Sequence, residues 1–102
     1  MGMAKGGSNL SRSEAQRILR EATRDGRVGF EEAHCRRRMV EREVTEEDVL
    51  KCLMLGRITE GPALNARGNW KMTVHRFAAG EELDVVAVIE VPDDGVIVVT
   101  VI

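Results

Sequence analysis

The pattern of apolar and polar positions divides the chain into a helical first half and a strand-forming second half. In the segment 11–26, apolar residues follow one face of a helix, at Ala15, Ile18, Leu19 and Ala22. Ser11 and Glu14 have the spacing of a capping box, and Gly26 is a typical residue after a helix end. We therefore expect a first amphipathic helix here.

Two more helices are expected before residue 57. A segment that begins at Phe30 carries two glutamates at its start and contains no Gly or Pro up to residue 43. Thr45 and Asp48 then repeat the box-like spacing, and an apolar stripe runs from there to Gly56.

Beyond residue 56 apolar and polar residues alternate as in a strand and no longer follow the period of a helix. The pattern predicts four strand segments, at residues 57–60, 70–75, 83–91 and 96–102. Pro92, two Asp and Gly95 form the turn between the last two, which are rich in Val and Ile. The expected fold class is α+β, with about three N-terminal helices packed on an antiparallel sheet of three or four strands.

The strand segment 83–91 is apolar on both faces, since Val86 and Val88 alternate with Val85, Ala87 and Ile89. A sheet with one face in water should alternate more cleanly between apolar and polar side chains. We therefore expect the second face to be covered by a helix or by another chain, and the sequence favours a homodimer.

The length of 102 residues suits one domain. Residues 1–10 have the composition of a flexible leader or a cloning remnant, and residues 11–102 are expected to form a single α+β domain. No apolar run approaches the roughly 20 residues of a membrane span, and no secretory signal is visible. We expect a cytoplasmic protein without membrane contact. No nucleotide-binding motif occurs, and no cofactor is expected.

The net charge of −2 conceals an asymmetry between the two halves. Residues 1–44 contain ten Lys and Arg against seven Asp and Glu, whereas residues 45–102 contain five against ten. A clearly basic domain is typical of nucleic-acid binding. An RNA site on this chain would therefore be local and would lie on one helix face of the first half.

One group of residues in that half has side chains suited to catalysis. His34, Arg38 and Arg42 lie four residues apart, so that on a helix they form one stripe. An imidazole can transfer a proton near neutral pH and guanidinium groups can hold a phosphate, a combination that suits phosphodiester cleavage. The alternative is structural: the arginines could pair with Glu41, Glu46 or carboxylates of the sheet, and His34 could cap a helix or fill a boundary position.

Three residues of the second half could complete such a site. Lys71 and His75 share the outer face of their expected strand and could supply a cation and a second proton-transfer group, unless that face is merely solvated. Arg67, in the loop before that strand, could reach a phosphate. A metal site is not expected, because the available ligands lack the spacing of a chelating group: His34, Cys35, Cys52 and His75.

A family resemblance is carried by residues 34–42 (HCRRRMVER), residues 44–49 (VTEEDV) and Leu55-Gly56. In order and spacing they resemble domain-of-unknown-function family 4258, which reads roughly H-A-x-x-R-M-x-E-R-x-I-S-x-x-D-V, then L-x-x-G, strands and a closing V-x-x-V-T. Residues 96–100 are similar to that ending, so the resemblance covers about residues 30–102. The family often has L-H-V in its penultimate strand, where this chain has Asp84 after Leu83.

The resemblance implies a RelE-like or barnase-like ribonuclease fold and points to His34, Arg38, Arg42 and Thr100. The leading hypothesis is a metal-independent endoribonuclease of toxin type, with RNA as substrate and an antitoxin-like protein as partner. In it His34 is the base, His75 the acid, and the two arginines stabilise the phosphate. The alternative is a non-catalytic interaction module that dimerises or binds a partner through its Val/Ile-rich hairpin.

Overall fold

Three helices and five strands follow one another along residues 9–102, the part of the chain that the computed structural model describes. In chain order they are α2 (Arg12–Asp25), β1 (Val28–Phe30), α3 (Ala33–Arg42), α4 (Glu46–Leu55), β2 (Arg57–Leu64), β3 (Trp70–Ala78), β4 (Glu81–Ile89) and β5 (Val96–Val101). The expected mixed α+β class and the three helices are thereby confirmed.

The boundaries of α2 and α4 follow the capping signals of the sequence. The Glu14 amide donates to Ser11 Oγ at the start of α2, and Gly26 takes a left-handed conformation (φ 76°) after its end. At α4, the Asp48 amide donates to Thr45 Oγ1 while the Asp48 carboxylate accepts from the Thr45 amide, which completes a capping box. The expected start of the second helical segment at Phe30 was wrong, because Phe30 belongs to β1 and α3 begins at Ala33 without a side-chain cap.

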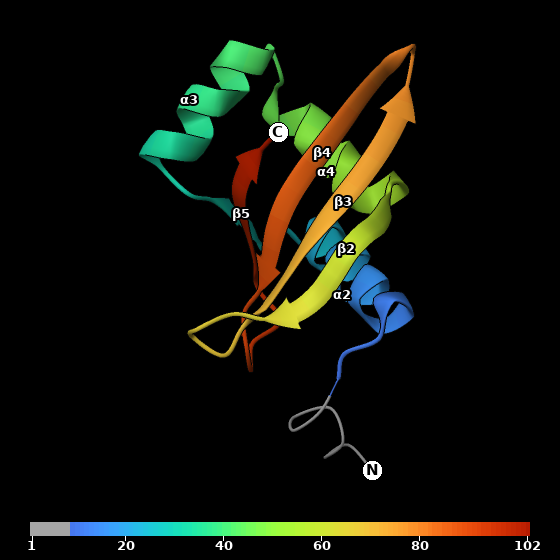
Figure 1. Ribbon diagram of the computed structural model, residues 1–102, viewed down its shortest axis with the longest axis vertical. Coiled ribbons are helices and arrows are strands. Elements are labelled where there is room, and N and C mark those ends of the chain that lie inside the picture. The colour runs from blue at the N-terminus through green and yellow to red at the C-terminus, as the bar shows by residue number, and fades with distance from the viewer. Residues whose placement is uncertain (1–8) are drawn as a thin grey trace.

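The five strands form one sheet in the order β1-β5-β4-β3-β2 (Figure 1). Strands β2 to β5 are antiparallel neighbours, but β1 pairs with β5 in parallel. The four expected strands are present and antiparallel, but the expected total of three or four strands was wrong, because a fifth strand joins the sheet in parallel. The missed strand, β1, has only three residues, too few to show an alternation, and its partner is the last strand of the chain.

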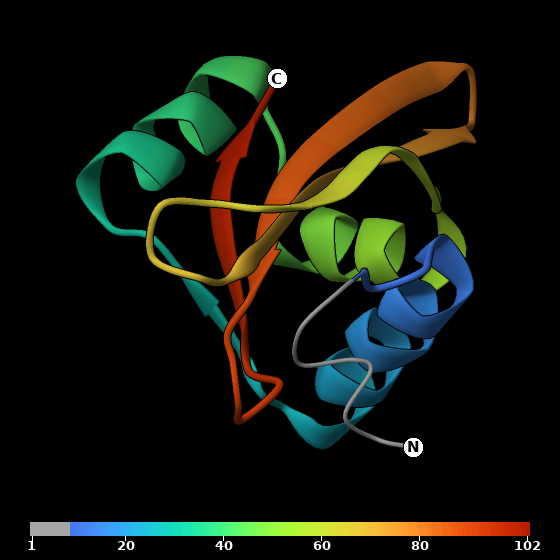
Figure 2. The same cartoon turned by 60° about the horizontal axis from the view of Figure 1, so that its bottom comes forward.

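Helices α2 and α4 pack on each other and on one face of the sheet, while α3 lies beside β5 (Figures 1 and 2). The core fills the space between these helices and strands, with fully buried side chains that include Leu19, Leu53, Val74, Ile89 and Val98. Leu10, which the sequence placed in the leader, is also buried there. The rest of that expectation, for residues 1–8, lies outside the described residues.

The opposite face of the sheet, turned toward the viewer in Figure 1, is called the open face here. By strand register it carries Arg57, Glu60, Lys71, Thr73, His75, Asp84, Val86, Val88 and Thr100. Within residues 9–102 no helix lies across it. The sequence predicted that a helix or another chain would cover this face, and the described residues contain no such helix. Val86 and Val88 are nevertheless only 9% and 8% exposed.

None of the helices in the described part of the chain is both long and apolar enough to cross a membrane.

Candidate functional site

A histidine–aspartate pair lies at one end of the open face. Strands β3 and β4 turn at Ala79 and Gly80, which both have positive φ (54° and 79°), and this turn makes His75 and Asp84 cross-strand partners. His75 Nδ1 lies 2.9 Å from Asp84 Oδ1, and the side chains are 29% and 36% exposed. A carboxylate on one ring nitrogen fixes the orientation of an imidazole and leaves the other nitrogen for chemistry.

Arg57 extends this pair into a row across three strands. It is the β2 partner of His75, so their side chains share the open face. Arg57 is exposed, and its side chain forms no hydrogen bond or ion pair with any described residue. We call Arg57, His75 and Asp84 the His75 row.

Neither Arg57 nor Asp84 was predicted from the sequence as a site residue. The position of Asp84 could have been found by counting outward from the β3–β4 turn, since His75 and Asp84 are equally distant from it. Arg57 could not have been found in this way, because two register irregularities in the β2–β3 pairing shift the strands against each other.

Two further predicted residues lie on the open face, at a distance from the row. Lys71 is four residues from His75 on β3, which is about 13 Å along a strand, and it lines a cavity of about 380 Å³ beside β2. Thr100 is the β5 partner of Val86, and its hydroxyl donates to the Val101 carbonyl. Arg67 lies in the β2–β3 loop, beyond Lys71, at the opposite end of β3 from His75.

The predicted stripe on α3 lies beside the sheet. Cys35 and Met39 turn into the core, which leaves His34 and Arg38 on other sides of the helix. Arg38 Nε donates to the Val101 carbonyl (3.3 Å) and its Nη1 to Glu41 Oε1 (3.0 Å). The pairing with Glu41 is one of the structural contacts that the sequence offered as the alternative to a catalytic role. His34 is exposed, and its side chain has no hydrogen-bond partner among the described residues.

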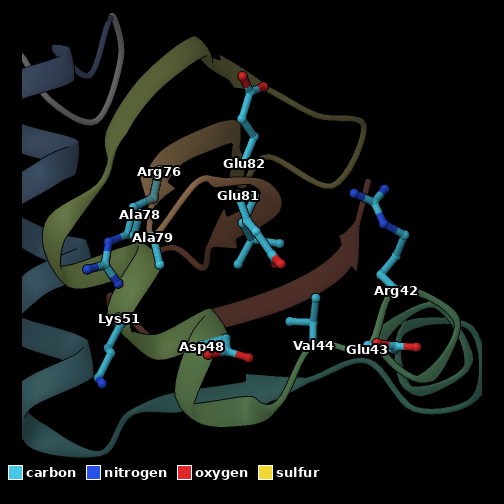
Figure 3. A pocket seen from close by; sticks show the side chains of 11 residues that line it. Arg42, Glu43, Val44, Asp48, Lys51, Arg76, Ala78, Ala79, Glu81 and Glu82 are labelled. Atoms are coloured by element: carbon cyan, nitrogen blue, oxygen red, sulfur yellow. The ribbon is translucent and has the colours of Figure 1, made fainter.

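Arg42 lines a different cavity from the other candidates. This cavity of about 470 Å³ lies between the end of α3, the start of α4 and the tip of the β3–β4 hairpin (Figure 3). Its wall carries charges of both signs, from Arg42, Arg76, Lys51, Asp48 and Glu81 among others. None of the remaining predicted site residues lines it. The structure thus brings His75, Lys71 and Thr100 to one face but does not gather all candidates in one cavity.

The cysteines lie apart from this chemistry. Cys35 and Cys52 are free and fully buried. Burial raises the pKa of both thiols, that of Cys52 to about 12, with the Asp84 charge adding to the effect there. Among residues 9–102, no group of three or more His, Cys, Asp or Glu side chains is arranged to hold a metal ion.

A family model described as Domain of unknown function (DUF4258) matches residues 32–102, which include α3, α4 and the sheet from β2 to β5. The matched region contains every candidate residue described above. No curated protein matches the chain, and no solved structure does.

Proposed function

The chain belongs to the DUF4258 family, and from this premise we propose that it is a metal-independent endoribonuclease of toxin type, with a RelE-like fold, that binds RNA across its open face. The observation that carries the proposal is the His75–Asp84 pair. It provides an oriented, partly exposed imidazole on a sheet face that no helix of residues 9–102 covers.

The reaction needs groups that this face and its edge offer. An imidazole removes the proton of an RNA 2′-hydroxyl, the 2′-oxygen attacks the adjacent phosphorus, and the bond to the 5′-oxygen breaks as that oxygen takes up a proton. The products are a 2′,3′-cyclic phosphate and a 5′-hydroxyl. His75 is the candidate for one of the two proton transfers, and arginines stabilise the negative charge that develops on the phosphate. His34, the other imidazole that the sequence proposed, lies on α3 beside β5, two strands from His75.

The remaining candidates have supporting roles in this proposal. Lys71 lies too far from His75 to share one phosphate, so it is assigned to a neighbouring phosphate of the same strand. Thr100 contributes a hydroxyl to the same face, and Arg38 lies at the edge of β5. Arg67 and Arg42 would contact RNA only beyond the centre of the face. An antitoxin-like partner would inhibit the enzyme by covering the open face.

Cleavage of a mixed RNA pool in EDTA tests the proposal. The wild-type chain should cleave it, and His75→Ala should lose most of the rate, by about 10²–10⁴-fold for the removal of a general acid or base. His34→Ala and Arg38→Ala should also be slower. Arg24→Ala, a change on the helix side of the molecule, is the control. Absence of cleavage by the wild type, or equal rates for wild type and His75→Ala, would refute the proposal.

The interaction module is a second candidate, and one observation favours it. Phe77 and Ile102 are large apolar side chains that are 63% and 50% exposed, and both lie near the His75 end of the open face. We propose that, if the chain is a homodimer, these residues form its contact. Light scattering should then show dimers that Phe77→Ser dissociates, whereas a monomer at high concentration would exclude this form.

A further inference from the structure

The order of residues in the His75 row has a chemical consequence. His75 lies between an acid on β4 and a cation on β2, and both are its cross-strand partners. We propose that the row is a phosphate-binding site in which Asp84 positions the His75 ring and Arg57 holds the anion beside it. This deepens the proposed RNA cleavage, on which it rests for the class of ligand.

Asp84 determines which nitrogen of the His75 ring reacts. An ionised carboxylate can only accept hydrogen bonds, so at 2.9 Å from Asp84 Oδ1 the Nδ1 atom carries the proton. In the neutral ring Nε2 then holds the lone pair and is the atom that accepts a proton from a hydroxyl. Asp84 is therefore a positioning residue, and His75 Nε2 takes the role of the base.

Arg57 is the cation best placed to hold the phosphate. Directly opposed residues on neighbouring antiparallel strands have their Cβ atoms about 5 Å apart, within reach of a guanidinium group. A guanidinium can hold a phosphate through two parallel hydrogen bonds. Arg38, by comparison, already donates to Val101 and Glu41, whereas no described residue occupies the donors of Arg57.

The Asp84 carboxylate does not prevent an anion from binding. It lies on the β4 side of His75, and Arg57 lies on the β2 side, so the ring separates the two charges. An anion held by Arg57 therefore lies closer to the imidazole than to the carboxylate.

Imidazole ¹⁵N NMR of the full chain tests each part without any cleavage assay. In the wild type, His75 should show the Nδ1–H tautomer, and Asp84→Asn should shift the ring toward Nε2–H. Titration with inorganic phosphate should move the His75 signals, and Arg57→Gln should weaken this binding by about tenfold, as expected for the loss of a charged hydrogen-bond pair. Arg24→Gln, the same change on α2, is the matched control and should bind phosphate like the wild type.

The outcomes separate this proposal from the proposed function. An Nε2–H tautomer in the wild type, or equal phosphate affinity in wild type and Arg57→Gln, overturns the assignment even if RNA is cleaved. The predicted tautomer and phosphate response would support it even if RNA is not cleaved. A short 2′-O-methyl RNA, which cannot be cleaved by this route, distinguishes the two sources of phosphate: tighter binding than inorganic phosphate at the same row supports RNA as the ligand.

Discussion

Replacement of Gly56 by alanine should destabilise the fold by steric overlap alone. Gly56 links α4 to β2, and a Cβ atom there would lie 2.6 Å from the carbonyl oxygens of both Cys52 and His75, and 3.1 Å from Val74 Cγ1. Separations under 3.0 Å essentially never occur for real Cβ atoms, and both close neighbours are backbone. The φ of −82° suits any residue, so no cost arises from the backbone conformation itself.

The expected cost is that of overpacking, about 1–3 kcal/mol in the free energy of unfolding. For a domain of this size each kcal/mol corresponds to about 4–8 °C in Tm. Urea and thermal unfolding followed by circular dichroism would measure both quantities. Because the displaced oxygen belongs to His75, the amide NMR signals around the His75 row should shift as well.

Gly95→Ala is the matched control for this prediction. Its backbone is outside the left-handed region, and the nearest atom to an added Cβ is Glu90 Oε1 at 3.5 Å, an ordinary contact. Its unfolding free energy should stay within about 0.5 kcal/mol of the wild type, as for most surface changes. If Gly56→Ala were equally neutral, the close packing of α4 against β3 described here would be refuted.

Three other substitutions or reactions test separate parts of the structure. Thr45→Ala should cost about 0.5–2 kcal/mol through loss of the α4 cap. The Thr45 hydrogen bonds lower the pKa of Asp48 in the folded state, so their contribution is present above the unfolded-state pKa and is lost as the pH falls through the folded one; acid titration of stability should be shallower in Thr45→Ala. Leu53→Ala, at a fully buried position, should cost about 2–5 kcal/mol in urea unfolding. The Cys52 thiol, with its pKa raised to about 12, should resist iodoacetamide at pH 8 in the folded chain and react in urea; fast alkylation of the native protein would contradict its burial.

Local signals in the sequence were sufficient to predict the starts of α2 and α4, but not the start of α3, which has no side-chain cap. Ser11 with Glu14 and Thr45 with Asp48 mark helix starts by hydrogen bonds that span only three residues, and the structure forms both. The exclusion of a side chain at Gly56 could not be read from sequence, because it depends on where β3 passes the end of α4. Strand β1 was missed for the same reason, since its pairing with β5 joins distant parts of the chain.

The candidate site depended even more on tertiary structure. The spacing of His34, Arg38 and Arg42 correctly placed them on one helix, but it did not predict what each residue would contact. Arg38 donates to β5, while Arg42 lines a separate cavity. Conversely, Asp84 had no local signal of function, and the hairpin register alone made it the partner of His75. In this sheet the register depends on the β3–β4 turn and on irregularities in the β2–β3 pairing, which the candidate residues themselves do not reveal.

RNA binding to the open face around His75 is the step on which the proposed cleavage depends. Backbone amide NMR mapping with a non-cleavable 2′-O-methyl RNA tests it most directly. We expect the largest shifts at Arg57, His75 and Asp84, with smaller ones at Lys71 and Thr100. Shifts confined to the Arg42 cavity or to α2, or no shifts at all at low salt, would contradict it.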